Sequence, residues 1–230
     1  MSANGLANGH MSARNVSARD GVLAKVRQSL RDVTANSSAA READYAAIPR
    51  DYIQQGDSSR ETILSLLSSR LQDYDATVYP CLRHEIAHTV AVAMKARGKT
   101  SLLHPDQLPE EWLPAGYAFS RVNGLPYSEI DRGEGVITGC VAAIALTGTI
   151  ILHHGSVDGR RALTLIPDYH LCIVFADQVV ETVPEGFERL AGMATLPLTT
   201  VSGPSATADI EMSRVKGVHG PRFLDVILVA

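Results

Sequence analysis

The sequence predicts an α/β protein, a three-layer sandwich in which helices cover both faces of a largely parallel β-sheet. Short and nearly continuous apolar runs recur along the chain, which is typical of strands buried on both faces. Amphipathic helical patterns lie between some of these runs, as expected when helices connect parallel strands. A length of 230 residues, with 45% hydrophobic and 20% charged residues, suits one such domain with appendages.

The first part of the chain predicts an arm that precedes this domain. Residues 1–17 are rich in Gly, Asn, Ser and Ala and have no apolar period, so we expect them to be disordered. Residues 18–57 should form a helical arm and a loop, because apolar residues recur at helical spacing from Val22 to Val33. Basic residues occupy the rest of this helix, which favours a solvated face over an anionic partner.

The α/β domain is expected to span residues 58–230. Ser58 and Glu61 have the spacing of a capping box, and a buried apolar stripe follows them. A second helix is predicted over residues 84–97, ended by Gly98, and a third over residues 184–193. Apolar runs predict strands over residues 76–81, 101–104, 136–138, 149–152, 162–166, 171–175 and 225–229.

Composition excludes several classes of function. The net charge of −4 gives no field that attracts nucleic acid. The longest apolar run, residues 139–152, is far short of a membrane span, and the first residues lack the apolar core of a secretory signal. Cys81, Cys140 and Cys172 are widely separated, which favours reduced and inert thiols over a cluster or zinc site. We therefore expect a cytoplasmic protein with no cofactor and no nucleic-acid or membrane partner.

Residues 84–88 read His-Glu-Ile-Ala-His and fit the HExxH pattern of zinc hydrolases. In that reading His84 and His88 bind zinc and Glu85 acts as general base. The helical period places both histidines opposite the apolar stripe and in line with Lys95, which is a poor neighbour for a dication. We expect no metal site here, although His153 and His154 could complete one in three dimensions.

Two Gly-containing segments predict a pocket for a small anion. Thr147, Gly148 and Thr149 stand at the end of an apolar strand, where glycine lets the backbone approach a ligand. Residues 202–205, Ser-Gly-Pro-Ser, follow another apolar run and are expected to open a helix. The start of such a helix attracts a carboxylate or a phosphate. The predicted ligand-binding residues are Thr147, Gly148, Thr149, Gly203, Pro204, Ser205, Thr207 and Asp209.

His219 is the best candidate for proton transfer, because it lies in a Gly-rich turn ahead of the last strand. Glu211 is a second catalytic candidate. If the two segments meet at the carboxyl ends of neighbouring strands, His219 should lie near the crevice between them. The alternative is structural: Gly203 and Pro204 make a tight turn, and Ser205 and Thr207 cap a helix.

Three sequence blocks resemble the LutC/YkgG family of lactate-utilisation proteins and its LUD domain. They are residues 144–152 (IALTGTIIL), residues 159–174 (GRRALTLIPDYHLCIV), and residues 202–211 (GPSATADIE after the first Ser) with residues 217–221 (GVHGP). The resemblance implies a fold like that of the sugar-phosphate isomerase, CoA-transferase and formyltetrahydrofolate cyclo-ligase group. One departure is Leu146, where relatives usually carry an acidic residue.

The resemblance also implies a function. The protein would serve the oxidation of L-lactate to pyruvate together with iron–sulfur partner proteins, as a subunit or accessory protein that binds a small organic anion. One alternative is a free-standing enzyme of the CoA-transferase or cyclo-ligase type that acts on an anionic small molecule. A zinc hydrolase that uses His84 and His88 is the other.

Overall fold

The computed structural model describes residues 10–29, 38–155, 159–193, 196–207, 215–217 and 219–230. The chain divides into two units, Met1–Tyr52 and Ile53–Ala230. Residues between Ile53 and Ser58 are tied to the larger unit, because the Gln54 carbonyl accepts a hydrogen bond from Thr182 Oγ1 at 3.0 Å. Among the described residues, no helix combines the length and the apolar character that a membrane span needs.

The amino-terminal unit contains helices α1 (His10–Ser29) and α2 (Ser38–Ala46). The helix predicted within residues 18–57 therefore starts earlier, at His10, inside the segment that was predicted to be disordered. Residues 10–20 contain neither Gly nor Pro, so their local propensity does not oppose a helix. Val22 and Val26 of the predicted stripe are exposed in this unit, and Leu30 and Val33 lie outside the described residues.

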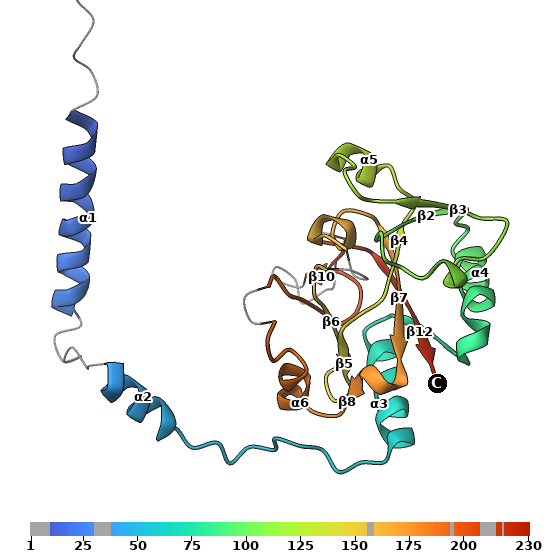
Figure 1. Ribbon diagram of the computed structural model, residues 1–230, viewed down its shortest axis with the longest axis horizontal. Helices are drawn as coiled ribbons and strands as arrows, with labels where there is room; N and C mark the ends of the chain where they lie inside the picture. Colours follow the sequence, from blue (N-terminus) through green and yellow to red (C-terminus); the bar gives the residue numbers. More distant parts are fainter. Residues whose placement is uncertain (1–9, 30–37, 156–158, 194–195, 208–214, 218) are drawn as a thin grey trace, which may run out of the picture. The chain divides into compact units, whose positions relative to one another are not determined.

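Six parallel strands form the centre of the larger unit, which confirms the predicted fold class (Figure 1). Side chains of a strand alternate between the two faces of the sheet. On the central strand β7, Tyr169, Leu171 and Ile173 therefore face one side, and His170, Cys172 and Val174 face the other. The spatial order is β1 (Thr77–Cys81), β12 (Phe223–Val229), β7 (Tyr169–Phe175), β4 (Val136–Thr138), β2 (Ser101–His104) and β3 (Ala118–Arg121).

The face of Tyr169 packs against helix α4 (Ile86–Ala96), with η1 (Arg83–Glu85) before it, and against η2 (Glu110–Trp112). The buried stripe of α4 reads Ile86, Val90, Ala93 and Met94, at the helical spacing that the sequence predicts.

The opposite face is covered by helix α3 (Arg60–Asp73) and by a second sheet. Its four strands, in spatial order, are β8 (Val179–Val180), β5 (Ala142–Ile144), β6 (Thr149–Leu152) and β9 (Thr199–Val201). The other elements of the larger unit are α5 (Tyr127–Asp131), η3 (Arg161–Thr164), η4 (Ala176–Gln178), α6 (Val183–Glu188), β10 (Ala206–Thr207) and β11 (Val215–Lys216).

Two local predictions are wrong. Residues 162–166 were expected to form a strand, but Arg161–Thr164 form a 3-10 helix that buries Leu163. Ser58 does not cap α3: its hydroxyl donates to Glu181 Oε1 at 2.8 Å, and Ser59 caps the helix by accepting from the Thr62 N–H. The N-cap of α3 is therefore Ser59, one residue after the predicted position, because the Ser58 hydroxyl is bonded to Glu181.

A buried ion pair joins α4 to the amino ends of three strands. The side chain of Asp225 on β12 is completely buried, and the Arg97 guanidinium donates to both of its oxygens. Tyr169 donates its phenol to Asp225 Oδ2 at 3.0 Å, and Arg97 also donates to Thr77 Oγ1 at 3.0 Å. Burial, followed by the nearby carboxylate, raises the pKa of Tyr169, so that its phenol stays protonated and donates.

The Glu134 carboxylate binds the backbone at the start of β2, and we expect this contact to make stability depend on pH. Glu134 accepts hydrogen bonds from the Thr100 N–H at 2.7 Å, the Ser101 N–H at 3.1 Å and the Thr100 hydroxyl at 3.0 Å. The hydrogen bond from the Thr100 N–H is the largest cause that lowers the pKa of Glu134. The ionised Glu134 carboxylate therefore stabilises the fold above its unfolded-state pKa of about 4.3. This stabilisation is lost as pH falls through the lower folded-state pKa.

We expect Glu134→Gln to remove that dependence. The unfolding free energy of wild type and variant, measured with urea at pH 7 and at about pH 3, should differ more at pH 7. An equal difference at both pH values would show that the Glu134 charge does not stabilise the fold.

Candidate functional site

A cavity of about 250 Å³ lies on the α3 side of the main sheet, between that sheet and strand β9 of the second sheet. It is lined by residues 164–165, 170, 199–206, 219–221 and 224. We call it the Ser205–His219 cavity. Most of its wall comes from two of the three sequence blocks that resemble the LutC/YkgG family, residues 159–174 and residues 202–211 with 217–221. This makes it the strongest candidate for the ligand site.

Ser205 holds two segments of this cavity together. Its N–H donates to the Pro221 carbonyl at 2.8 Å, and its carbonyl accepts from the Gly217 N–H at 2.9 Å. Its hydroxyl accepts from the His219 N–H at 3.1 Å. The Gly-Pro-Ser turn and the turn of His219, which the sequence predicted to be neighbours, therefore share one wall. Gly203, Pro204, Ser205 and His219 all line the cavity.

The threonines of the first Gly-containing segment reach the cavity through a chain of hydroxyl groups. Thr147 Oγ1 lies 2.7 Å from Thr149 Oγ1, which lies 2.8 Å from Ser202 Oγ. Ser202 lines the cavity, whereas Thr147 and Thr149 stand behind it. Of the remaining predicted residues, Thr207 lies in β10. Asp209 and Glu211 lie outside the described residues.

The prediction of a helix that starts after Gly203 is wrong. The chain continues from Ser205 into β10, which pairs with β11 in antiparallel fashion. The backbone of Ser205 is bonded on both sides to the turn before β12, which favours an extended path over a helical start. The prediction of an anion site at this turn therefore loses the support that a helix start would have given it.

The position of the cavity relative to the sheet also differs from the expectation. His170 and Leu224 lie at the amino ends of β7 and β12, and both line the cavity. The crevice was expected at the carboxyl ends of neighbouring strands. Among the described strands, β9 alone has its carboxyl end at the cavity, since the lining residue Ser202 directly follows it. The segment before β6 reaches this place because β6 and β9 are antiparallel.

Both glycines stand where a side chain would collide with α3 or with Tyr74 at its end. Gly148 has a φ of 59°, and a Cβ atom on it would lie 2.8 Å from the Cβ atom of Arg70 on α3. Gly203 has a φ of 84°, and its Cβ would lie 2.4 Å from the Cβ atom of Tyr74. The chain thus needs glycine at both positions where it crosses the end of α3.

His170 is the cavity residue that sequence reasoning missed. Its side chain is only 2% exposed, and its Nε2 lies 2.8 Å from Thr138 Oγ1 on β4. The available signal was a histidine inside an otherwise apolar strand, since buried polar side chains are uncommon and need partners. That partner is 32 residues away in the sequence, so no local pattern could identify it.

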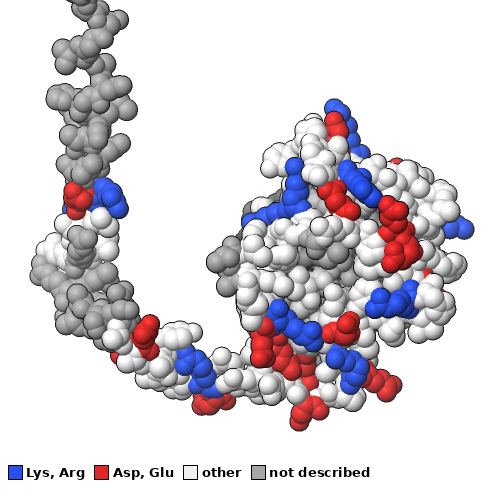
Figure 2. All heavy atoms as spheres, in the orientation of Figure 1, with Lys and Arg blue, Asp and Glu red and all other residues white. Residues whose placement is uncertain are grey.

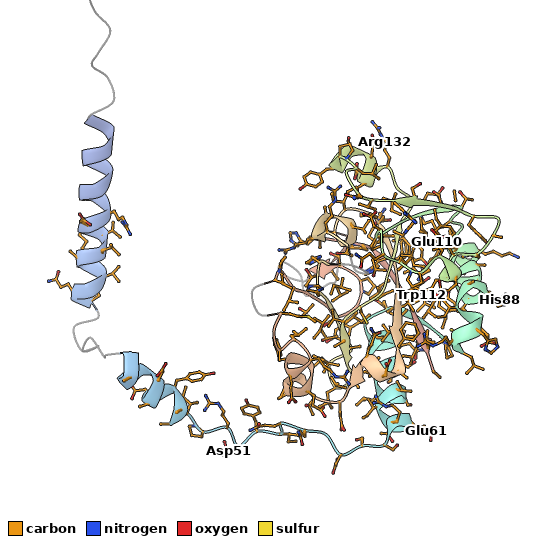
Figure 3. All side chains as sticks on the ribbon, in the orientation of Figure 1. Asp51, Glu61, His88, Glu110, Trp112 and Arg132 are labelled. Atoms are coloured by element: carbon orange, nitrogen blue, oxygen red, sulfur yellow. The ribbon has the colours of Figure 1, made fainter. Side chains whose placement is uncertain are left out.

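The structure offers little support for a zinc site at His84 and His88. Both side chains are exposed, and Figure 3 shows His88 at the outer surface of α4. The Glu85 carboxylate accepts from the Leu82 N–H at 2.8 Å and so closes the start of the helix. His154 is bonded to Thr199 Oγ1 at 2.6 Å. The described part of the chain holds no group of three or more His, Cys, Asp or Glu side chains placed to bind a metal.

The three cysteines differ in their burial. Cys140 and Cys172 are buried, and Cys81 is half-buried. Burial raises the pKa of Cys81, which disfavours its reactive thiolate form. On the face of the larger unit seen in Figure 2, basic and acidic side chains are interspersed.

Comparison with known proteins confirms the resemblance that the sequence blocks suggested. Residues 127–229 match the LUD domain family. The chain is 45% identical over 174 residues to lactate utilization protein C of Deinococcus radiodurans, covering 74% of this chain and 81% of that protein. It is 34% identical over 113 residues to lactate utilization protein C of Bacillus subtilis, covering 46% and 42%.

A solved structure supports the same assignment. The crystal structure of a DUF162 family protein from Deinococcus radiodurans matches with a TM-score of 0.66 and 38% identity, covering 76% of this chain and 100% of that chain. The uncharacterized protein YkgG of Escherichia coli is 35% identical over 101 residues, covering 40% of this chain and 43% of that protein. The chain therefore belongs to the lactate utilization protein C family and carries its LUD domain in residues 127–229.

Proposed function

We propose that this protein is a component of a cytoplasmic L-lactate utilisation system and binds a small organic anion in the Ser205–His219 cavity. In this system lactate is oxidised to pyruvate together with iron–sulfur partner proteins. The protein acts as a subunit or accessory protein rather than as an enzyme on its own. The names of its relatives support the role in lactate utilisation. The single observation that supports the site is that two distant family-like blocks meet in one cavity.

The chemistry of the wall suits a small carboxylate. The Ser205 hydroxyl accepts a hydrogen bond from the His219 N–H, which leaves its proton available for donation to a ligand. Ser202 offers a second hydroxyl, and the His219 imidazole can donate from the rim. The described lining residues include no aspartate or glutamate that would repel an anion.

The variant His219→Ala tests this proposal. The His219 side chain is exposed, so we expect the melting temperature to change little. Affinity for L-lactate, measured by titration calorimetry with the full chain, should fall about tenfold or more, because a charge-assisted or neutral hydrogen bond to the carboxylate is lost. Growth on lactate of a strain that lacks its own copy should fail with this variant.

A matched control is His88→Ala, which removes another exposed histidine, from α4 and outside the residues that line the cavity. It should bind L-lactate like wild type. If His219→Ala keeps its affinity and supports growth, or if it loses several degrees of stability while function persists, His219 belongs to the scaffold and the proposed site is wrong.

A further inference from the structure

His170 is a buried base whose hydrogen-bonding direction can be worked out from its partner. Its Nε2 lies 2.8 Å from the hydroxyl of Thr138, which is itself completely buried. That hydroxyl also lies 2.9 Å from the Gly139 carbonyl. A hydroxyl group has one proton to donate, and a carbonyl can only accept. If the Thr138 hydroxyl donates its proton to the Gly139 carbonyl, it must accept the hydrogen bond from His170.

The Thr138 proton points to the Gly139 carbonyl. The Cys172 thiol also lies 3.5 Å from this carbonyl, but a thiol is a weak donor and does not replace a hydroxyl at 2.9 Å. Thr138 Oγ1 must then accept the proton of His170 Nε2. In a neutral imidazole only one nitrogen carries a proton, so Nδ1 of His170 is an unprotonated acceptor.

This acceptor has no hydrogen-bond partner among the residues that the structure describes. The ring is 98% buried and forms part of the wall of the Ser205–His219 cavity. A buried acceptor without a partner is unfavourable, because it has lost water and gained nothing. Because Nε2 is engaged by Thr138, Nδ1 is the ring atom through which His170 could accept a hydrogen bond from a ligand in the cavity that it lines.

We propose that His170 Nδ1 accepts the hydroxyl proton of the ligand, and that the cavity selects 2-hydroxycarboxylates over the corresponding 2-oxocarboxylates. This inference rests on the proposed function, which places a small carboxylate beside Ser205 and His219. A 2-hydroxycarboxylate carries a hydroxyl donor on the carbon next to its carboxylate. It thus satisfies Ser205 on one side and His170 on the other.

A 2-oxocarboxylate carries a carbonyl at the same place. Its carbonyl oxygen is a hydrogen-bond acceptor, so it cannot donate to His170 Nδ1, which would stay without a hydrogen bond. Sites built to bond a substrate hydroxyl reject analogues that lack it more strongly than apolar pockets reject a change in size. In this scheme His170 binds the ligand and Thr138 is a positioning residue that fixes the tautomer of the ring.

Titration calorimetry of the full chain with L-lactate and with pyruvate at pH 7.5 tests the selectivity. We expect the Kd for L-lactate to be at least tenfold lower than that for pyruvate. In His170→Phe, which keeps a ring but has no acceptor, the preference should fall below about threefold. In Thr138→Val, which keeps the shape of the side chain but frees the tautomer, the preference should also shrink. Pyruvate binding by each variant shows that its cavity has folded.

A second measurement needs no variant. Nitrogen-15 NMR of the histidine side chains should find His170 of the wild-type protein protonated on Nε2 alone. Equal affinities for L-lactate and pyruvate would overturn the selectivity and leave the proposed anion site intact. Binding of neither compound would overturn the proposed site and this inference with it. A proton on Nδ1 of His170 would overturn this inference alone.

Discussion

Asp225→Ala should lower the free energy of unfolding by roughly 3–5 kcal/mol, the range for breaking one partner of a buried ion pair. The carboxylate is completely buried, and the variant would leave the Tyr169 phenol without its acceptor and the Arg97 guanidinium with the Thr77 hydroxyl but without its ion-pair partner. Because Arg97 is on the segment that ends α4 and Asp225 is on β12, the loss should loosen the helix from the sheet. Urea unfolding followed by circular dichroism measures the change.

The matched control for this prediction is Asp168→Ala. Asp168 accepts from Arg222 at 2.6 and 2.9 Å, but both side chains are partly exposed, so water replaces the lost contact. We expect a much smaller loss than for Asp225→Ala, because solvent screens this exposed pair. If Asp225→Ala cost no more than Asp168→Ala, the buried ion pair would not hold α4 to the sheet.

Gly203→Ala should lower the free energy of unfolding by roughly 2–4 kcal/mol, the sum of a left-handed backbone and a steric overlap. The φ of 84° disfavours any side chain, and the new Cβ would lie 2.4 Å from Tyr74 Cβ and 3.0 Å from the Tyr74 carbonyl oxygen. Neither of these two atoms is the far end of a flexible side chain, so the turn or the end of α3 must shift. Thermal and urea unfolding measure the effect.

Gly116→Ala separates the two contributions. Its φ of 89° is similar, but nothing lies within 4 Å of its ideal Cβ position. This control should lose only the backbone part, roughly 1–2 kcal/mol. Equal losses at Gly203 and Gly116 would show that contact with Tyr74 does not matter. Unchanged stability of Gly203→Ala with loss of ligand binding would instead support the view that Gly203 lets a ligand approach.

Five strands of the main sheet, β1, β2, β4, β7 and β12, could be predicted because they read as short apolar runs. Strand β3 (Ala118–Arg121) was missed, because its side chains are mostly exposed and form no apolar run. The second sheet could not be predicted as a sheet, although its strand β6 was expected over residues 149–152. Its strand β5 lies inside the long apolar run of residues 139–152, and β8 has only two residues. Residues 162–166 look like a strand for the same reason, since a short apolar run cannot be told from a buried turn of helix by its period.

The candidate site could be predicted in part. The Gly-Pro-Ser turn and His219 stand in a recognisable block, and the structure brings them together at Ser205. The helix expected after Pro204 is wrong because proline and serine suit a turn as well as a first helical turn. His170 was missed because its role depends on Thr138, which only the pairing of β4 with β7 places beside it.

The central claim is that the Ser205–His219 cavity binds a small hydroxycarboxylate, and an NMR titration of the labelled full chain with L-lactate tests it most directly. Chemical shifts should change at Thr138, His170, residues 202–206 and residues 219–221, which line the cavity or contact its wall. Changes centred instead on Asn123 and Arg160, in the neighbouring cavity of about 320 Å³, would contradict the claim. So would spectra that stay unchanged at millimolar L-lactate.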